Sequence, residues 1–487
     1  MIANAGLINF RGFILALAGA LVLCWPIYVT QSVFYFSDTS SYIRGGEIIW
    51  NLVLGMFSAP ETAVHGAGAG GAAGEAAGMA DSSGSPFFVR SFVYSLATFI
   101  IVSIVGTLAV PVFQGVVVLF TLFALYSPDQ LLSRPIMIAG AVYLAVLTTL
   151  PWFTVYLMPD IFAAVVVIYG AILMRRYDEM SWPQRVVLTV IAALAIATHY
   201  GYPPVAAGLF VLVLIYRALR RRITAAVLFG ALFPLLFSPV ANLTASSVAL
   251  DTTSPAPLRL PILLARSLQD GPARWYLSEE CPEADLAFCE AFGDTEFLML
   301  EDFLWSDEGI NSLTPELMAR IRDEEIKVLY LSFRAYPVEQ TISFFGNVGE
   351  TLILAGTGAI FPAQTLDENF DPVDQDTQVT AAKLLEVFDT IIPLATWTGV
   401  LPLFWLMVTG RLSRRQYEIA FAVLAGLLLN ALVFGGLSAP AERYQSRVIW
   451  LLPALSVWFM AEYVSIRKTA GIGKGAAGQS SPRRGNS

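Results

Sequence analysis

The sequence predicts an all-α polytopic membrane protein with about ten transmembrane helices, juxtamembrane helices and a small, mainly helical extracytoplasmic domain. Of its 487 residues, 56% are hydrophobic and only 14% are charged, and the mean hydropathy is +0.65. Soluble domains are roughly 45–50% apolar and about 25% charged. The formal net charge is −9, but acidic and basic residues are segregated along the chain. This segregation indicates membrane topology and excludes a nucleic-acid partner.

Apolar runs close to the roughly 20 residues that a spanning helix needs recur along the chain. The predicted spans are 13–34, 107–126, 136–157, 161–174, 186–199, 205–219, 224–243, 388–409, 419–437 and 448–464. The segment 87–106 is also apolar, but a further crossing there would place the basic loop 175–185 outside. We therefore expect 87–106 to be a juxtamembrane or partly re-entrant helix, with Pro111 interrupting the next crossing.

Basic clusters set the expected orientation. With the N-terminus inside, every tight arginine cluster falls on the cytoplasmic side, including those at 175–185, 217–222 and 411–415. The acidic block between Asp251 and Asp376 falls on the other side. We therefore expect a multi-pass protein with both termini in the cytoplasm and its large polar loop outside.

Four regions follow from these patterns. Residues 1–245 form an N-terminal membrane module, whose first outer loop, 35–106, carries a flexible Gly/Ala-rich insert at 60–85. Residues 246–383 form the extracytoplasmic domain and 384–466 the C-terminal membrane helices. The tail, 467–487, is rich in Gly, Ser and Arg and is expected to be a disordered cytoplasmic tail.

Within the polar region, Cys281 and Cys289 lie close together, and outside the cytoplasm they would form a disulfide. A zinc site is the weaker alternative, because two cysteines without nearby histidines make a poor ligand set. The segment 314–336 predicts a helix capped by Thr314. We expect its apolar face, which includes Ile321 and Val328, to lie against the membrane or the spans.

Polar side chains gather where the predicted spans reach the outer side. Asp38 follows the first span in FYFSDTSSYIRGGEIIW, and Asp160 lies in MPD. The candidate site residues are Asp38, Arg90, Asp160, His199, Tyr202, Arg443, Tyr444 and Arg447. Taken singly, each carboxylate could cap a helix, the aromatic residues could form an interfacial belt, and the arginines could reach lipid headgroups. Taken together, outer arginines beside two carboxylates and a histidine indicate a functional site.

These groups suit transfer from a lipid phosphate. A carboxylate accepts a proton from an attacking hydroxyl as general base. Arginine binds a departing phosphate through bidentate hydrogen bonds. The sequence contains no phosphate-binding loop of the GxxxxGK[ST] type. A donor carried by a lipid therefore fits better than a soluble nucleotide.

Three features of the sequence are informative: an acidic residue in SDTSSY directly after the first span, the acidic MPD after the third span, and the large outer domain. Together they resemble the GT-C class of integral-membrane glycosyltransferases. The layout is similar to protein O-mannosyltransferases and the lipid A aminoarabinose transferase, inverting enzymes that use polyprenyl-phosphate sugars. The resemblance implies a bacterial cytoplasmic membrane enzyme. It also implies Asp38 as catalytic base, Asp160 as a second active-site acid, Arg443 and Arg447 on the donor phosphate, and Arg90 as a helper.

His199, Tyr202 and Tyr444 would complete the substrate site, which takes a polyprenyl-phosphate sugar donor and a glycan, lipid or protein acceptor among membrane lipids. The first outer loop lacks the paired acidic motif of better-known members. We assign no metal ligands, and the need for a divalent cation such as Mg²⁺ stays open. A transporter or flippase, a lipid-linked glycan polymerase or ligase, and a purely structural membrane protein remain alternatives.

Overall fold

The fold is almost entirely helical. The computed structural model describes residues 10–57, 90–126, 135–250, 254, 259–281, 283–293, 295–367, 370–373 and 378–477. Within these ranges, six helical stretches are long and apolar enough to cross a membrane. They are Gly12–Thr30, Tyr202–Leu219, Ala225–Val248, Thr380–Val408, Arg414–Gly436 and Glu442–Arg467. Shorter apolar helices pack beside them, as expected of a multi-pass membrane protein.

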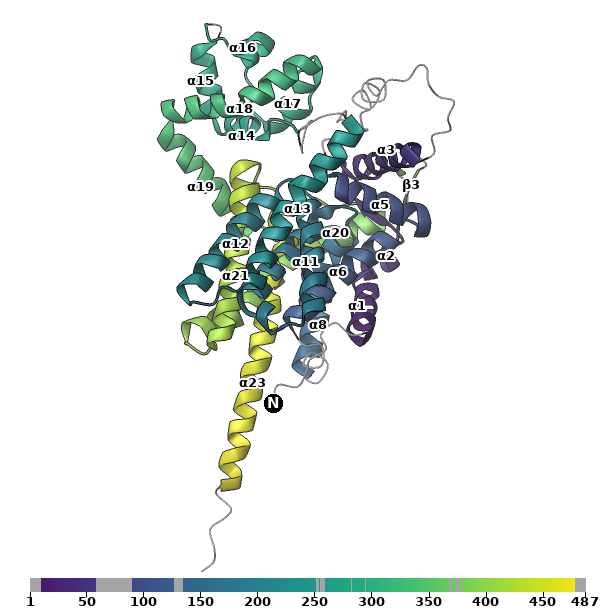
Figure 1. Ribbon diagram of the computed structural model, residues 1–487, viewed down its shortest axis with the longest axis vertical. Coiled ribbons are helices and arrows are strands. Elements are labelled where there is room, and N and C mark those ends of the chain that lie inside the picture. Colours follow the sequence, from purple (N-terminus) through teal and green to yellow (C-terminus); the bar gives the residue numbers. More distant parts are fainter. Residues whose placement is uncertain are drawn as a thin grey trace, which may run out of the picture.

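The membrane bundle contains a helix at each of the ten predicted spans (Figure 1). Its helices are α1 (Phe10–Leu23), α2 (Trp25–Thr30), α6 (Ala109–Leu125), α8 (Pro135–Leu147), α9 (Leu150–Val155), α10 (Phe162–Arg175), α11 (Trp182–Ala197), α12 (Tyr202–Leu219), α13 (Ala225–Leu250), α20 (Gln378–Val408), α21 (Arg414–Asn430), the π-helix η5 (Ala431–Gly436), α22 (Glu442–Ile449) and α23 (Leu451–Ala477). The 3₁₀ turns η2 (Pro159–Ile161) and η3 (Tyr177–Glu179) flank α10.

Prolines explain where the observed helices differ from the predicted spans. The first span ends at Thr30 and is divided before α2, whose first turn contains Pro26. Pro151 similarly opens α9 and divides the span predicted at 136–157. The prediction that Pro111 interrupts a crossing is wrong, since α6 begins at Ala109 and Pro111 lies in its first turn. A proline there breaks no helical hydrogen bond, because the first N–H groups have no partner within the helix.

Two helices of the first outer loop pack along one another at the upper end of the bundle. They are α3 (Thr39–Phe57) and α5 (Phe92–Val105), and α3 runs crosswise to the bundle helices (Figure 1). A Cβ at Gly46 would collide with the backbone of Ser95, so the absence of a side chain permits this close approach. The predicted insert at 60–85 lies outside the described residues.

A small helical domain stands beyond the same end of the bundle (Figure 1). It comprises α14 (Ile262–Asp270), α15 (Pro272–Glu280), α16 (Ala287–Phe292), α17 (Leu300–Trp305), η4 (Ile310–Ser312) and α18 (Pro315–Ala335), and α19 (Pro337–Ile353) follows α18. Cys281 and Cys289 form a disulfide, with their Cα atoms 5.4 Å apart.

The helix predicted at 314–336 is confirmed, and the Thr314 hydroxyl accepts a hydrogen bond from the Leu317 N–H. The predicted environment of its apolar face is wrong. Ile321 and Val328 are buried in the domain's own core with residues of α14 to α17. The apolar faces of the short surrounding helices pack against this face and against one another, and so bury it within the domain.

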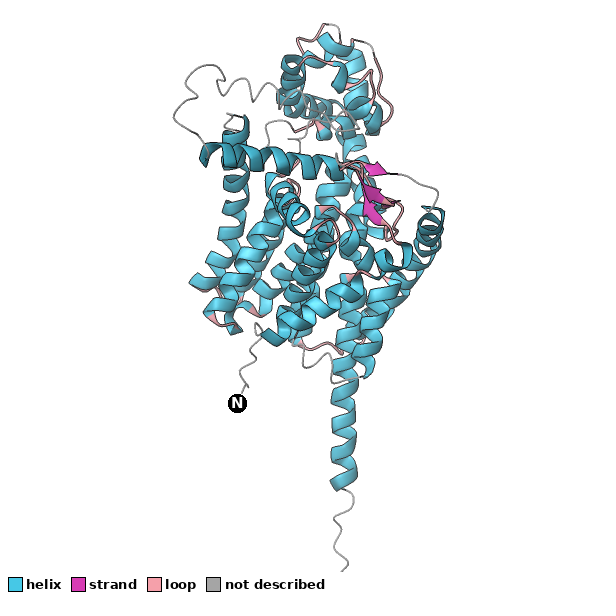
Figure 2. Cartoon of the chain, turned by 90° about the vertical axis from the view of Figure 1, so that its right-hand side faces the viewer, coloured by secondary structure: helices cyan, strands magenta, loops and turns pink. Residues whose placement is uncertain are grey.

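Four short strands lie at the upper end of the bundle (Figure 2). Strand β1 (Val33–Tyr35) pairs antiparallel with β2 (Phe361–Ala363), and β3 (Thr365–Leu366) pairs with β4 (Pro372–Val373). Phe34 also forms a bridge to Tyr156. These pairings bring the first outer loop against the segment before Asp160.

The C-terminal prediction requires a correction. Helix α23 continues to Ala477, so the expected disorder does not begin at 467. Adding residues to an existing helix costs far less than starting one. The remaining residues, 478–487, lie outside the described part of the chain.

Candidate functional site

Asp38 lies where the chain turns from β1 into α3. The Phe36 N–H donates to the Thr39 hydroxyl oxygen over 3.0 Å, and that hydroxyl donates to the Leu157 carbonyl over 3.2 Å. These bonds fix the turn beside the segment that leads to Asp160. Asp38 is 8% exposed, so its carboxylate is largely withdrawn from water.

Two arginines flank the Asp38 carboxylate. Arg90 Nη2 donates to Oδ1, and Arg443 Nη2 lies 4.0 Å from Oδ2. The Arg90 carbonyl in turn accepts a hydrogen bond from the Tyr200 hydroxyl over 3.2 Å. Arginines from two distant segments of the chain therefore converge on one carboxylate, and a third segment holds Arg90.

Asp160 and Arg447 form a second, more deeply buried ion pair. Their side chains are 1% and 0% exposed, and Arg447 Nη1 lies 3.0 Å from Asp160 Oδ1. Arg447 Nη2 also donates to Asn430 Oδ1 over 3.1 Å, and its guanidinium carbon lies 3.9 Å from the centre of the Phe434 ring. Such a pair is costly to desolvate, and its additional hydrogen bonds and cation–π contact offset part of that cost.

His199 lies in the turn between α11 and α12, beside the aromatic residues that surround Arg447. Its Nδ1 accepts a hydrogen bond from the Gly201 N–H over 3.0 Å. The ring packs on Tyr202 and Phe434, with centroids 5.0 and 5.3 Å away. Burial and the neighbouring arginines, Arg447 first among them, lower the pKa of His199 well below its usual value. The imidazole is therefore neutral and carries its proton on Nε2.

All eight predicted site residues gather in this region. Tyr202 donates its hydroxyl proton to the Pro159 carbonyl over 2.9 Å, next to Asp160. The Tyr444 ring lies 5.1 Å from the Arg443 guanidinium carbon and 5.2 Å from that of Arg447. Tyr444 thus links the two arginines of α22.

The site has more hydrogen-bonding capacity than its own residues use. Arg90 Nε, Arg443 Nη1, Arg447 Nε and Asp160 Oδ2 are buried without a hydrogen-bond partner among the described residues. Buried polar atoms are nearly always paired. Three guanidinium groups and two carboxylates also leave one excess positive charge. An anion would supply both the missing acceptors and the missing charge.

No protein-family model, curated protein or solved structure matches this chain. The chemistry of the site therefore rests on its own residues. A carboxylate that is still partly exposed lies beside cationic groups suited to an anionic substrate. This combination fits proton removal next to a phosphate group.

Several residues of the site are absent from the sequence prediction. The Phe36 ring lies 4.2 Å from the Arg443 guanidinium carbon. The Gln114 amide donates to the Thr154 and Tyr156 carbonyls, each over 2.9 Å, and so holds the chain at the end of α9. Isolated polar residues within apolar spans, such as Gln114 and Asn430, are the signal that could have revealed them.

Two further carboxylates, Glu442 at the start of α22 and Asp389 in α20, bind the loop that follows α19. Glu442 Oε2 accepts from the Gly358 N–H over 3.0 Å, and the Thr357 N–H donates to Asp389. Within the described ranges, no three His, Cys, Asp or Glu side chains form a group that could hold a metal ion. Asp38 and Asp160 each have an arginine partner.

Proposed function

We propose that this protein is a membrane glycosyltransferase of the GT-C type. It transfers a sugar from a polyprenyl-phosphate donor to a hydroxyl of a glycan, lipid or protein acceptor. The observation that carries the proposal is the Asp38 carboxylate between Arg90 and Arg443, two arginines with unpaired buried N–H groups. A base and a phosphate-binding pair thus occupy one site.

In the proposed reaction, Asp38 accepts the proton of the acceptor hydroxyl. The hydroxyl oxygen forms a bond to the anomeric carbon of the sugar while the bond from that carbon to the phosphate oxygen breaks. The electron pair of the broken bond stays on polyprenyl phosphate, which leaves with an additional negative charge. Arg90 and Arg443 stabilise that charge because their donors are already fixed around the site.

Asp160 has a positioning role in this proposal. Its carboxylate is bound to Arg447 and almost fully buried, so it holds a cation in place while Asp38 accepts the proton. His199, Tyr202 and Tyr444 pack around the arginines and keep water from them. Exclusion of water strengthens the attraction between guanidinium and phosphate.

The proposed setting is a bacterial cytoplasmic membrane crossed about ten times, with both termini in the cytoplasm. The small domain would lie outside, where its disulfide is stable. The site lies at the same end of the bundle as this domain, since Asp38 precedes the juxtamembrane helix α3. A donor carried by a membrane lipid reaches such a site without a soluble nucleotide.

The test measures release of polyprenyl phosphate by the purified full-length protein. The substrates are a panel of radiolabelled polyprenyl-phosphate sugars, with a membrane extract supplying acceptors. We expect release by the natural protein and a roughly 10²- to 10⁴-fold slower reaction in Asp38→Asn, which removes a general base with little change in shape. The control is Asp371→Asn, which alters a partly exposed ion pair with Arg44. Its rate should not change.

Two outcomes would contradict the proposal. Release of no polyprenyl phosphate from any donor by folded protein would exclude the transferase. Full activity of Asp38→Asn would place the base elsewhere. Arg443→Gln adds an independent test, since loss of a buried phosphate contact should weaken donor binding by roughly 2–5 kcal/mol.

A further inference from the structure

A cavity of about 570 Å³ lies at the end of the bundle opposite Asp38. Asp38 and the cavity lie at opposite ends of helix α10, because Asp160 of the first site precedes the helix and Arg175 of the cavity wall is its last residue. Its 14 residues correspond to about 21 Å at 1.5 Å per residue. Five arginines line the cavity: Arg175, Arg185, Arg217, Arg220 and Arg222.

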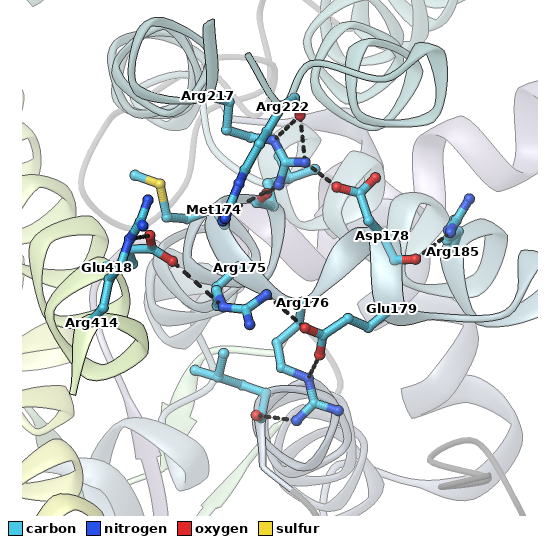
Figure 3. Close-up of polar contacts among 12 residues, drawn as sticks. Met174, Arg175, Arg176, Asp178, Glu179, Arg185, Arg217, Arg222, Arg414 and Glu418 are labelled. Carbon is cyan, nitrogen blue, oxygen red and sulfur yellow. Dashed lines mark hydrogen bonds and ion pairs between the residues drawn. The ribbon is translucent and has the colours of Figure 1, made fainter. Parts of the chain in front are cut away.

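The two carboxylates of the cavity wall are held by other wall residues (Figure 3). Asp178 accepts from Arg217 and, through Oδ1, from the Thr224 hydroxyl over 2.9 Å. Glu418 accepts from the Tyr216 hydroxyl over 2.9 Å and also pairs with arginines. The cavity wall carries an excess of positive charge, because its described residues include five arginines and only these two carboxylates.

Arg217 is part of the fixed wall. Its side chain is 5% exposed, and besides Asp178 it donates to the Leu173 carbonyl over 2.9 Å and to the Arg222 carbonyl over 2.7 Å. The first of these bonds satisfies a carbonyl in the last turn of α10, where no helical partner exists. Arg217 therefore fixes the chain that carries Arg222.

Arg220 and Arg222 have no carboxylate partner in the described part of the chain. The Arg220 guanidinium carbon lies 5.5 Å from the centre of the Tyr216 ring. Both side chains are exposed, so their donors are open to a ligand. Leu219, which is 78% exposed, and Ile223 flank these arginines in the sequence. Exposed apolar residues beside arginines at the end of membrane helices suit contact with lipid.

We propose that this cavity binds a phosphate group through Arg220 and Arg222. The group comes from an anionic phospholipid headgroup or from a soluble phosphate compound. The planar guanidinium forks suit phosphate oxygens, and Asp178 and Glu418 are already occupied by wall donors. The site is separate from the proposed donor site and does not depend on glycosyl transfer.

The test uses the full-length protein in a neutral detergent and fluorescent short-chain lipids. The probes are phosphatidylglycerol, phosphatidylcholine and, in competition, inorganic phosphate. We expect phosphatidylglycerol to bind more tightly than phosphatidylcholine, and Arg222→Gln to weaken its binding roughly tenfold. Arg221→Gln is the matched control, because it removes the same charge from the same segment but does not line the cavity. The affinity of Arg221→Gln for phosphatidylglycerol should change less than about twofold.

Competition by inorganic phosphate at low concentration, without preference for phosphatidylglycerol, would assign the site to a soluble phosphate compound. The proposal would be overturned if neither a phospholipid nor inorganic phosphate bound. It would also be overturned if Arg221→Gln and Arg222→Gln weakened phosphatidylglycerol binding equally. Arg220→Gln provides a second variant, and thermal unfolding of each variant shows whether the fold is retained.

Discussion

At the scale of single residues, the two acids of the candidate site differ in their access to solvent. Asp160 is 1% exposed and bound to Arg447, whereas the Asp38 side chain is 12% exposed. The sequence places both acids at the ends of spans and predicts that they meet the same arginines. It does not predict which acid pairs with which arginine, because that depends on how α10 and α22 pack together.

The buried position of His199 predicts that the stability of the fold depends on pH. Its pKa is lowered in the folded protein by burial and by Arg447, Arg443 and Arg90, so the unfolded chain binds a proton more readily. Stability should therefore be complete above the unfolded pKa of about 6.5. It should fall by about 1 kcal/mol for each pH unit as the pH drops below that value towards the folded pKa.

Thermal unfolding between pH 7.5 and 5.5 measures this effect, with His199→Gln as the comparison. The variant should unfold with a flatter pH dependence, since His65, the second histidine of the sequence, remains in both proteins. An equally steep dependence in His199→Gln would assign the effect to other groups.

At the scale of elements, helices hold the site and the small domain in place through their ends. In the small domain, carboxylates of α18 bind the N-termini of two neighbours. Glu325 Oε1 accepts from the Leu263 and Leu264 N–H groups over 2.8 and 3.1 Å, and Glu324 accepts from the Ala287 N–H over 2.7 Å. Helix N-termini favour negative charge. The spacing of apolar residues predicts α18 itself but not the helices that its acids cap.

Glu325→Gln should destabilise the small domain by about 3 kcal/mol. Glu325 is fully buried and pairs with Arg259, so the variant removes the partner of a cation together with the charge at the start of α14. Limited proteolysis of the full-length protein measures the change through cleavage between 259 and 335. Glu308→Gln, at an exposed position, should be cleaved like the natural protein. Equal resistance in Glu325→Gln would show that the buried pair contributes little.

At the scale of the whole molecule, the two ends of the bundle differ in charge. One end carries the site around Asp38 and the small domain with its disulfide. The other carries the arginine-lined cavity. The orientation in which basic clusters face the cytoplasm stays a prediction.

Cysteine labelling of intact cells tests that orientation. A membrane-impermeant maleimide should label Glu308→Cys from outside, whereas Arg221→Cys should react only after the membrane is opened. The background should be low, because Cys24 is buried and the other two cysteines are joined. The opposite labelling pattern would reverse the topology and place Asp38 at the cytoplasmic face.

The sequence by itself determined the helical membrane class, the approximate positions of the apolar helices and the helix beginning after Thr314. These properties depend on local composition and apolar periodicity, which are visible in a single segment. Only the tertiary structure decided that Arg90 binds Asp38, that Asp160 binds Arg447, and that Arg217 donates to a carbonyl in the last turn of α10. Each contact joins residues that are 44 to 287 positions apart. Such pairs follow from how whole helices pack, and no local pattern encodes them.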